Sequence, residues 1–477
     1  MSAVSIRPLR IPQPSPSLVT GLALGFGAVL LGALTALGGP VLGFGALIGM
    51  CVGAYILLNL TAGLYATVAI MALIPFATLP VKIAVTPTLI DCAIGAFILV
   101  YLFQYMTGRR IRPRLVPADL LIVAYMLFTT LSFVAGLGHA PPTTTVLRRF
   151  AEMQLSIAFA IILVDVLRDV PTLRRLVLVI IVLGAAQAVI GLGLWALNDQ
   201  TAERILNSLG RFGYPQGGVI RYVEENPDLA ERAIGTWVDP NAYGGFLLLV
   251  GVLCGAQILV ERPVTGKRWI ALALFAPIAL AILLTQSRGA FVAIVAAALF
   301  IALLRYRWLI PLMIAGGVLF LVLPFTQGYV DRFLQGVNNQ DLATQMRFGE
   351  YKDSLILIGR YPLLGVGFTG TPDRDIYLGV SSMYLTIAGT SGISGLLLFL
   401  AILAETFRYG LRRWHVIRAR ADLLPVWLGS AAALLGALVG GVFDHFYANI
   451  QFGGSVLLFW LFVGLALSAA RLTGEAK

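Results

Sequence analysis

The chain has 477 residues, of which 59% are hydrophobic and only 12% are charged. Soluble domains are about 45–50% apolar and about 25% charged, so this composition excludes a soluble globular protein and indicates a polytopic membrane protein. The formal net charge of +11 would suit a nucleic-acid partner, but the cations gather in short loops between apolar segments, where they set membrane orientation instead.

Apolar segments recur along the whole chain, mostly about 18–25 residues long, which is the length at which a helix crosses a hydrocarbon core of roughly 30 Å. We therefore predict an all-α protein with about 12–14 transmembrane helices. The candidate spans are residues 20–38, 41–60, 62–80, 86–106, 117–137, 150–167, 174–197, 240–260, 269–286, 288–304, 308–325, 383–405, 425–444 and 452–470.

Arginine and lysine in the short connections predict that both termini face the cytoplasm, by the positive-inside rule. This orientation assigns residues 1–19 and 471–477 to the cytoplasm. It divides the rest into N-terminal transmembrane helices (20–197), an extracytoplasmic loop (198–239), central transmembrane helices (240–325), a large extracytoplasmic loop (326–382) and C-terminal transmembrane helices (383–470). The cysteines lack the spacing of a disulfide framework or zinc site, and no acidic cluster predicts a metal site.

Both long loops contain aromatic and aliphatic residues, and loops of this length in a compact protein are usually functional or disordered. In the first loop, Asp239 and Pro240 are typical of a helix start, with Asn241 facing the incoming loop. Arg232 lies seven residues before Asp239, so we expect it near a helix N-terminus, which attracts anions. The structural alternative is a solvated loop charge beside the acidic Glu231.

Arg288 lies between two long apolar runs, in LLTQSRGAFVAIVAAALFIALL. An arginine near the middle of a bilayer costs roughly 2.5–3.5 kcal/mol, so such residues usually mark a functional site. We predict that Gln286, Ser287 and Arg288 surface briefly between two spans, on the same face as Arg232. The alternative is an arginine that snorkels to the interface or pairs with a carboxylate.

The second loop contains QMRFGEYKDSLILIG, in which Arg347, Tyr351 and Ser354 fall at helical spacing. We predict a helix at the membrane surface here, ended by Pro362 and the glycines that follow it. Arg347 and Glu350 stand three residues apart, so an ordinary surface ion pair is the alternative to a functional role.

The order of these pieces resembles the O-antigen ligase and polymerase superfamily, bacterial membrane glycosyltransferases that act on undecaprenyl-diphosphate-linked sugars. An arginine ahead of a Gly-Thr and a Pro-Asn pair is matched by Arg232, Gly235, Thr236, Pro240 and Asn241. A Ser-Arg-Gly at a span junction is matched by Ser287, Arg288 and Gly289. An arginine, an aromatic, a proline and Gly-x-Gly in the large loop are matched by Arg347, Tyr351, Pro362, Gly365 and Gly367.

The fourth motif departs from the family pattern. The ligases typically have a histidine at the exit of the large loop, ahead of two glycines that stand three residues apart. Counting back from Gly392 and Gly395 puts Ser381 at the histidine position and Ser382 after it. Because that histidine is the usual candidate for activating the acceptor, its absence favours a polymerase or another transferase branch over a lipid A-core ligase.

The resemblance implies a GT-C-like enzyme in the bacterial inner membrane that works at the extracytoplasmic face, with metal-independent, inverting transfer. An acceptor hydroxyl attacks the sugar C1, and the diphosphate leaves with growing negative charge. Arg232 and Arg288 are the expected stabilisers, because their planar forks bind phosphate oxygens bidentately. The other substrate-binding candidates are Arg347, Asn241, Ser287, Tyr351, Ser381 and Ser382.

The implied partners are an undecaprenyl-diphosphate-linked oligosaccharide donor, a glycan or lipid-linked glycan acceptor and the lipid bilayer. A chain-length regulator and a flippase are candidate protein partners, and no nucleic acid is expected. No cofactor is expected either, because the diphosphate bond of the donor supplies the free energy and the sequence carries no nucleotide-binding fingerprint.

Three accounts of the general base stay open at this point. Serine cannot accept a proton usefully near neutrality, whereas histidine titrates close to it. Asp444 with His445, at the outer end of a late span, would supply a base, although an interfacial polar pair is their structural alternative. Glu350 in the large loop is the second candidate. In the third account no dedicated base is needed, because departure of the diphosphate leads.

Two other functions also stay open. A lipid-linked oligosaccharide flippase or another transporter would need many spans and a charged cavity, although no internal repeat typical of transporters stands out. Within the superfamily, transfer of O-antigen to lipid A-core and protein O-oligosaccharyl transfer are alternatives to polymerisation. A non-catalytic assembly partner with the same fold is the remaining alternative.

Overall fold

The computed structural model describes residues 59–79, 86–338, 342–371 and 379–474, together with scattered positions between 21 and 55. Residues 1–62 and 63–477 form two separate compact units, and the site described below lies in the second; α2 begins at the end of the first. The candidate spans 20–38 and 41–60 fall in the first unit and largely outside the described residues.

Seven described helices are long and apolar enough to cross a membrane, and a bent pair, α11 with α12, raises the number to eight if it counts as one span. The seven are α3 (Leu89–Met106), α4 (Pro117–Gly136), α6 (Val170–Ala196), α8 (Pro240–Leu259), α9 (Arg268–Thr285), α14 (Met383–Arg412) and α17 (Gly453–Arg471). The shorter apolar helices are α2 (Leu60–Leu73), α10 (Arg288–Leu304) and α16 (Leu424–Gly440). The chain is therefore an all-α polytopic membrane protein, as its composition predicted.

The remaining helices carry more polar sequence or are short. They are α5 (Thr144–Val166), α7 (Asp199–Ser208), η1 (Leu209–Phe212), η2 (Val223–Glu225), α11 (Leu309–Val322), η3 (Pro324–Thr326), α12 (Gln327–Val337), α13 (Leu342–Arg360) and α15 (Trp414–Ala419). The strands β1 (Arg221–Tyr222) and β2 (Glu231–Arg232) form an antiparallel pair that matches Arg221 with Arg232. Two predicted spans are shorter than expected: residues 62–80 yield the 14-residue α2, and residues 308–325 yield the 14-residue α11.

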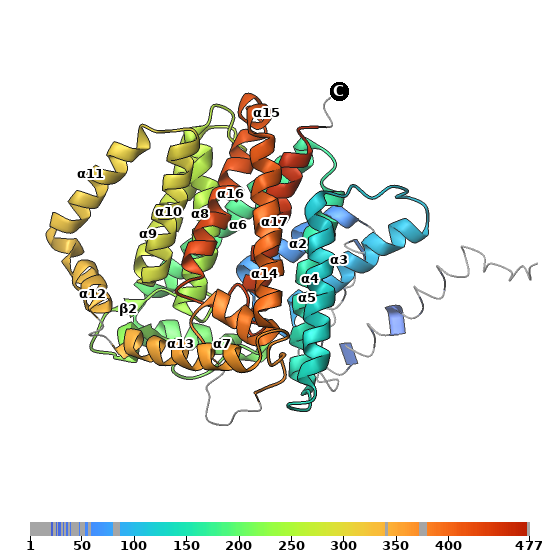
Figure 1. Ribbon diagram of the computed structural model, residues 1–477, viewed down its shortest axis with the longest axis horizontal. Helices are drawn as coiled ribbons and strands as arrows, with labels where there is room; N and C mark the ends of the chain where they lie inside the picture. Colours follow the sequence, from blue (N-terminus) through green and yellow to red (C-terminus); the bar gives the residue numbers. More distant parts are fainter. Residues whose placement is uncertain are drawn as a thin grey trace, which may run out of the picture. The chain divides into compact units, whose positions relative to one another are not determined.

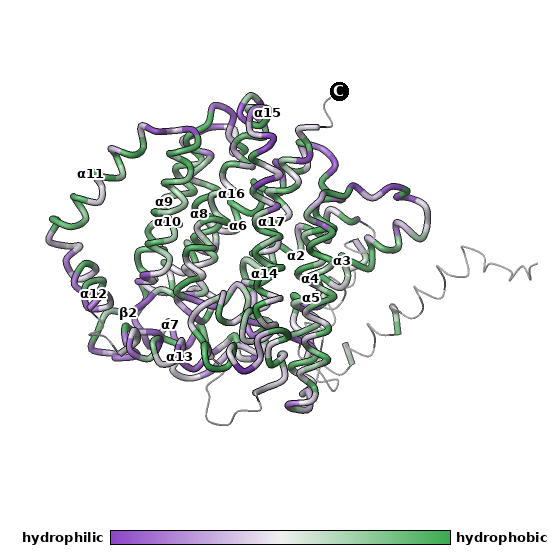
Figure 2. Tube along the Cα trace, in the orientation of Figure 1, coloured by the Kyte–Doolittle hydropathy of each residue, from purple (hydrophilic) through white to green (hydrophobic). Residues whose placement is uncertain are grey.

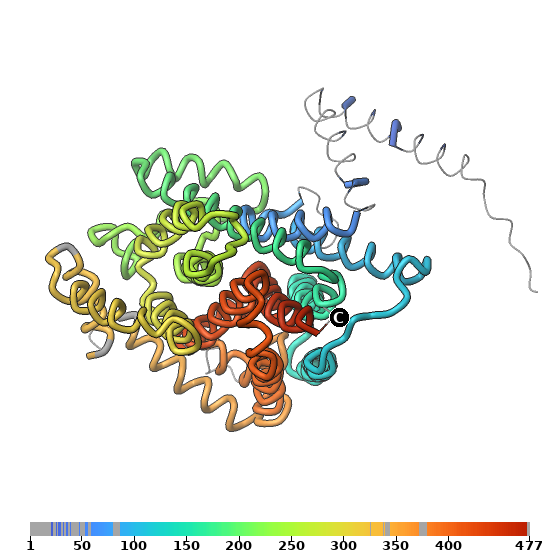
Figure 3. The backbone as a smooth tube through the Cα atoms, turned by 90° about the horizontal axis from the view of Figure 1, so that it is seen from above, coloured from blue at the N-terminus to red at the C-terminus, as the bar shows by residue number. Residues whose placement is uncertain are grey.

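Burial separates central helices from peripheral ones. Within an apolar 18-residue stretch of each helix, 94% of the residues are buried in α17 and 83% in α8, but only 28% in α3 and in α9. A helix that is apolar all round belongs in a core, so α8 and α17 form the centre of the bundle, where α16 packs against both (Figures 1 and 3). Small residues allow close approach here: a side chain at Gly464 would meet Leu163 of α5, and one at Gly429 would meet Leu253 of α8.

The polar segments collect at the two ends of the helices, as Figure 2 shows in purple. In Figure 1, α15 lies at one end, and α7, β2 and α13 lie at the other. Elements of both long loops therefore share one end, and the loop after α14 lies at the opposite end.

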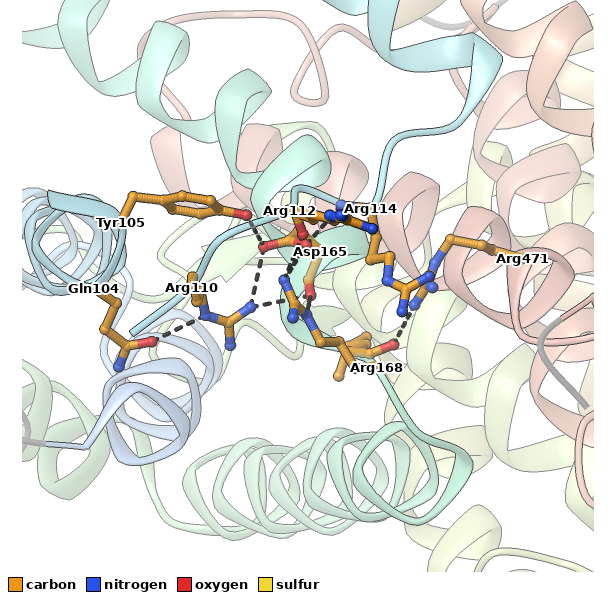
Figure 4. Close-up of polar contacts among 9 residues, drawn as sticks. Gln104, Tyr105, Arg110, Arg112, Arg114, Asp165, Arg168 and Arg471 are labelled. Atoms are coloured by element: carbon orange, nitrogen blue, oxygen red, sulfur yellow. Dashed lines mark hydrogen bonds and ion pairs between the residues drawn. The ribbon is translucent and has the colours of Figure 1, made fainter. Parts of the chain in front are cut away.

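At the α15 end, a buried carboxylate joins two connections (Figure 4). Asp165 accepts hydrogen bonds from Tyr105 Oη at 2.9 Å, Arg110 Nη1 at 3.0 Å, Arg168 Nη2 at 2.8 Å and the Arg114 backbone N–H at 2.8 Å. These bonds attach the segment after α3 to the α5–α6 turn. The arginines predicted only as a topology signal thus also hold the loops together.

A glycine junction fixes the end of α13 against α4 and α14. The long helix α14 is broken at Gly392, whose φ of 71° and ψ of 176° are accessible essentially to glycine alone. The break frees the carbonyls of residues 389 and 390, which accept hydrogen bonds from the backbone N–H groups of Val366 and Gly367 at 2.9 Å. Gly365 has φ of 66°, and a side chain there would come within 2.5 Å of the Thr390 backbone. The predicted Gly-x-Gly is therefore a packing motif that sets the position of α13.

We expect Gly392→Ala to lower the stability of the folded protein by about 1–3 kcal/mol, the typical cost of a residue forced into a glycine-only conformation. Its added carbon would also collide with the Leu363 carbonyl. Thermal unfolding in detergent measures the effect. The matched control is Gly389→Ala in the same helix, where the nearest neighbour, a Leu357 methyl, would lie 3.9 Å away. Equal melting temperatures for the two variants would contradict the junction.

We expect single cysteines at the exposed Gln216 and Asn338 to react with an impermeant maleimide on intact cells, in a background freed of the natural cysteines. A cysteine at the exposed Arg412 should react only after permeabilisation, because it lies in the last turn of α14, at the opposite end. The reverse labelling pattern would overturn the predicted orientation.

An arginine-lined candidate site

The centre of the candidate site is the turn that joins α9 to α10. α9 ends at Thr285, and Gln286 takes a left-handed conformation with φ of 50° and ψ of 30°. Ser287 is buried, and α10 begins at Arg288. The last carbonyls of a helix have no partner within it. The turn therefore presents the carbonyls of Thr285 and Gln286 to hydrogen-bond donors from elsewhere in the chain.

Arg232 supplies one of these donors. Its Nε donates to the Thr285 carbonyl at 2.8 Å, and its Nη2 donates to Asn241 Oδ1 at 2.7 Å. Asn241 is held at the start of α8 by Asp239, whose Oδ1 accepts from the backbone N–H groups of Asn241 and Ala242 at 2.8 Å. The predicted helix start at Asp239 and Pro240 is confirmed, and it places Arg232 beside the α9–α10 turn.

Arg332, on α12, supplies the second donor, and the sequence interpretation missed it. Its Nη1 donates to the Gln286 carbonyl at 3.1 Å and to Gln286 Oε1 at 2.9 Å. Arg288 in turn donates from Nη1 to the Arg332 carbonyl at 3.2 Å and from Nη2 to Thr344 Oγ1 at 3.4 Å. Arg332 matches none of the motifs named above. The sequence feature that could have indicated it is its position as a cation in a polar segment just after a predicted span.

Three guanidinium groups thus surround one turn. Burial, reinforced by the positive charge of Arg332, lowers the pKa of Arg232 to about 10, so Arg232 still carries its charge at neutral pH. The carboxylates of Asp239, Asp444 and Glu225 act in the opposite direction but do not cancel the effect. An arrangement that holds like charges together in a partly buried place favours binding of an anion.

The helix predicted in the second loop is confirmed as α13, and it holds the segment before α14. Glu350 Oε2 accepts from the Ser381 backbone N–H at 2.9 Å. Tyr351 Oη donates to the carbonyls of Ser381 at 3.1 Å and Val442 at 3.2 Å. Ser382, buried, directly precedes α14. These contacts bring the large loop and the turn after α16 together.

Asp444 follows α16 on that turn. Its carbonyl accepts from the Met383 backbone N–H at 2.9 Å, and its Oδ1 accepts from the His445 backbone N–H at 2.8 Å. Burial raises the pKa of Asp444 above its ordinary value, Asp239 adds to the rise, and the positive charge of Arg347 opposes it. The carboxylate therefore lies within electrostatic reach of both Arg347 and Arg232.

The ring of His445 lies beside Asp444, with Nδ1 3.5 Å from Asp444 Oδ1. This separation is too long for a hydrogen bond, and Nδ1 is buried without a partner among the described residues. Of the other histidines, His139 lies against the Val366 carbonyl and the Tyr361 ring, beside the glycine junction.

The structure links the predicted site residues through two sets of contacts. Around the α9–α10 turn lie Arg232, Asn241, Ser287 and Arg288. Around the start of α14 lie Arg347, Glu350, Tyr351, Ser381, Ser382, Asp444 and His445. Arg232 and Asp444 connect the sets electrostatically. Among the described residues, no three His, Cys, Asp or Glu side chains gather closely enough to hold a metal ion.

Comparison with known proteins finds one family. Residues 271–400 match the family model described as O-antigen ligase. The matched range runs from α9 into α14 and contains the α9–α10 turn, Arg332 and the whole of α13, whereas Arg232, Asn241 and Asp444 lie outside it. No curated protein matches the chain.

Proposed function

We propose that this chain, a member of the O-antigen ligase and polymerase superfamily, is a membrane glycosyltransferase of cell-surface polysaccharide synthesis. It transfers or polymerises undecaprenyl-diphosphate-linked oligosaccharide units at the extracytoplasmic face. The observation that carries the proposal is the gathering of Arg232, Arg288 and Arg332 around the α9–α10 turn. A diphosphate leaving group is the anion that this arrangement suits.

In the proposed reaction, an acceptor hydroxyl attacks C1 of the donor sugar from the face opposite the diphosphate. The new bond joins the acceptor oxygen to C1, and the bond between C1 and the phosphate oxygen breaks. Its electron pair goes to the diphosphate, whose growing charge Arg232 and Arg288 stabilise. Guanidinium groups remain charged at working pH and bind phosphate oxygens bidentately, and partial exclusion of water strengthens the attraction.

Asp444 is the carboxylate that best fits the general base, with His445 beside it. Glu350 already accepts a backbone hydrogen bond from Ser381, which supports a role in holding the loop. The raised pKa of Asp444 brings its basicity closer to the working pH, where a general base is most effective. Ser381, held through its backbone N–H and carbonyl, is then a positioning residue at the place where the ligases have histidine.

The position of the charges supports a transferase over a transporter. Transporters place ionisable groups near the bilayer midplane, between repeated halves. Here Arg232, Arg288 and Arg332 meet where α9 ends and α10 begins, beside the polar loops. The serine at position 381 supports the polymerase branch over transfer to lipid A-core.

We expect Arg288→Ala to lower the transfer rate about 100- to 1000-fold, the usual effect of removing one donor to a developing negative charge. Arg288→Lys should also impair transfer, because an ammonium keeps the charge but not the planar fork. The assay uses purified protein and a lipid-linked oligosaccharide. Arg211→Gln, which removes an exposed charge of the first long loop, is the control. Wild-type rates for Arg288→Ala would exclude the donor-binding role.

We expect wild-type kcat/KM to fall as pH drops through the raised pKa of Asp444, because the base must be deprotonated to accept the hydroxyl proton. In Asp444→Asn this acidic limb should disappear, and the rate at neutral pH should fall about 100-fold or more. The comparison variants are His445→Ala and Glu350→Gln. If Asp444→Asn keeps both its rate and its acidic limb, Asp444 is not the base.

A further inference from the structure

The α9–α10 turn is under strain, and its immediate support comes from α12. Gln286 is not glycine, yet it takes the left-handed conformation, which persists only where surrounding contacts enforce it. Arg332 provides such a contact twice, since the same Nη1 donates to the backbone carbonyl and to the side chain of Gln286. The main chain that precedes Arg288 is therefore fixed by a side chain from another helix.

The support is reciprocal, because Arg288 also holds α12. Its guanidinium donates to the Arg332 carbonyl at 3.2 Å. It lies directly against Gly336, one turn further along α12, where any side chain would collide with Nη1. The absence of a side chain at position 336 thus leaves room for the Arg288 guanidinium. The position of α12 and the conformation of Arg288 therefore depend on each other.

Among the described residues, the aromatic contacts of α12 involve one side chain, and much of its apolar surface is exposed. The ring centroid of Tyr329 lies 6.1 Å from that of Phe291 on α10 and 6.3 Å from that of Phe320 on α11. The large side chains of Phe333 and Leu334 are exposed, and α11, which leads into α12 through a bend of 94°, has no buried residue. Segments with few buried apolar contacts open most easily. The polar contacts of Arg332 and Arg288 therefore contribute directly to holding α12 against the α9–α10 turn.

We propose that Arg332 is a positioning residue, which holds the Gln286–Arg288 turn in place for the donor diphosphate and couples the seating of α12 to diphosphate binding. The inference rests on the proposed function for the identity of the anion. A diphosphate bound between Arg232 and Arg288 offsets the repulsion that Arg332 exerts on Arg232. It therefore favours the seated state, and by linkage seating favours diphosphate binding.

Hydrogen exchange of the purified full chain in lipid nanodiscs tests the coupling without any sugar transfer. Undecaprenyl diphosphate should slow exchange of the amides of residues 327–336 in the wild type by about 5- to 150-fold, the range of typical coupling between sites. Arg332→Gln should lose this protection, and Arg332→Lys should recover part of it. The control Arg211→Gln should keep it in full.

Kinetics provide the second readout. Arg332→Gln should raise the donor KM by about the same factor as the lost protection while the acceptor KM stays within about twofold, a split that general misfolding would not produce. Gly336→Ala checks the account in a chain that keeps Arg332. It raises the helix propensity of α12, yet it displaces the Arg288 guanidinium, so it should weaken protection and donor binding in the same direction.

The outcomes separate this inference from the proposed function. If the wild type transfers no sugar but undecaprenyl diphosphate protects α12 through Arg332, the transferase proposal fails and the coupling stands. If the wild type transfers sugar while Arg332→Gln and Gly336→Ala both match Arg211→Gln in protection and donor KM, the coupling is wrong and the transferase proposal stands.

Discussion

The unpaired carbonyls at the end of α9 are the constraint on which the site depends. A helix end inside a membrane protein needs hydrogen-bond donors, and here the donors are the guanidinium groups of Arg232 and Arg332. Satisfying two neighbouring carbonyls with two cations brings like charges together, and burial, reinforced by the charge of Arg332, lowers the pKa of Arg232. The same bonds attach β2, the start of α8 and α12 to one turn. A structural requirement of the backbone thus gathers cations around one turn, where we propose that the anion binds.

The sequence predicts much of the fold because apolar runs report membrane spans directly. The predicted spans 240–260, 269–286 and 288–304 have the same ends as α8, α9 and α10 to within a residue or two. The sequence does not predict where a helix breaks, because a break depends on contacts between residues that are far apart in the chain. The break in α14 occurs where the carbonyls of residues 389 and 390 pair with the segment after α13. Likewise, α11 ends early because the chain bends sharply into α12.

The local structure of the candidate site was predictable where residue type and local context agreed, as for the capped start of α8 beside Arg232 and for the helix that carries Tyr351. Arg332 was not predictable, because its partner Gln286 is brought near only by the bend that returns α12 to α10. The choice between the two candidate carboxylates also required the three-dimensional structure. Glu350 and Asp444 are both candidate bases in the sequence. Glu350 accepts a hydrogen bond from the backbone of Ser381 in a distant part of the loop, whereas Asp444 accepts one from the adjacent His445 and lies in the field of Arg347 and Arg232.

A structure of the full chain with bound undecaprenyl diphosphate, determined by electron cryomicroscopy in a lipid nanodisc, tests the central claim most directly. The account predicts phosphate oxygens within about 3 Å of the guanidinium nitrogens of Arg288 and Arg232, close to the α9–α10 turn. It also predicts that the sugar-bearing end of the diphosphate points toward Asp444. A diphosphate bound away from this turn, with Arg232 and Arg288 still engaged only by protein groups, would contradict it.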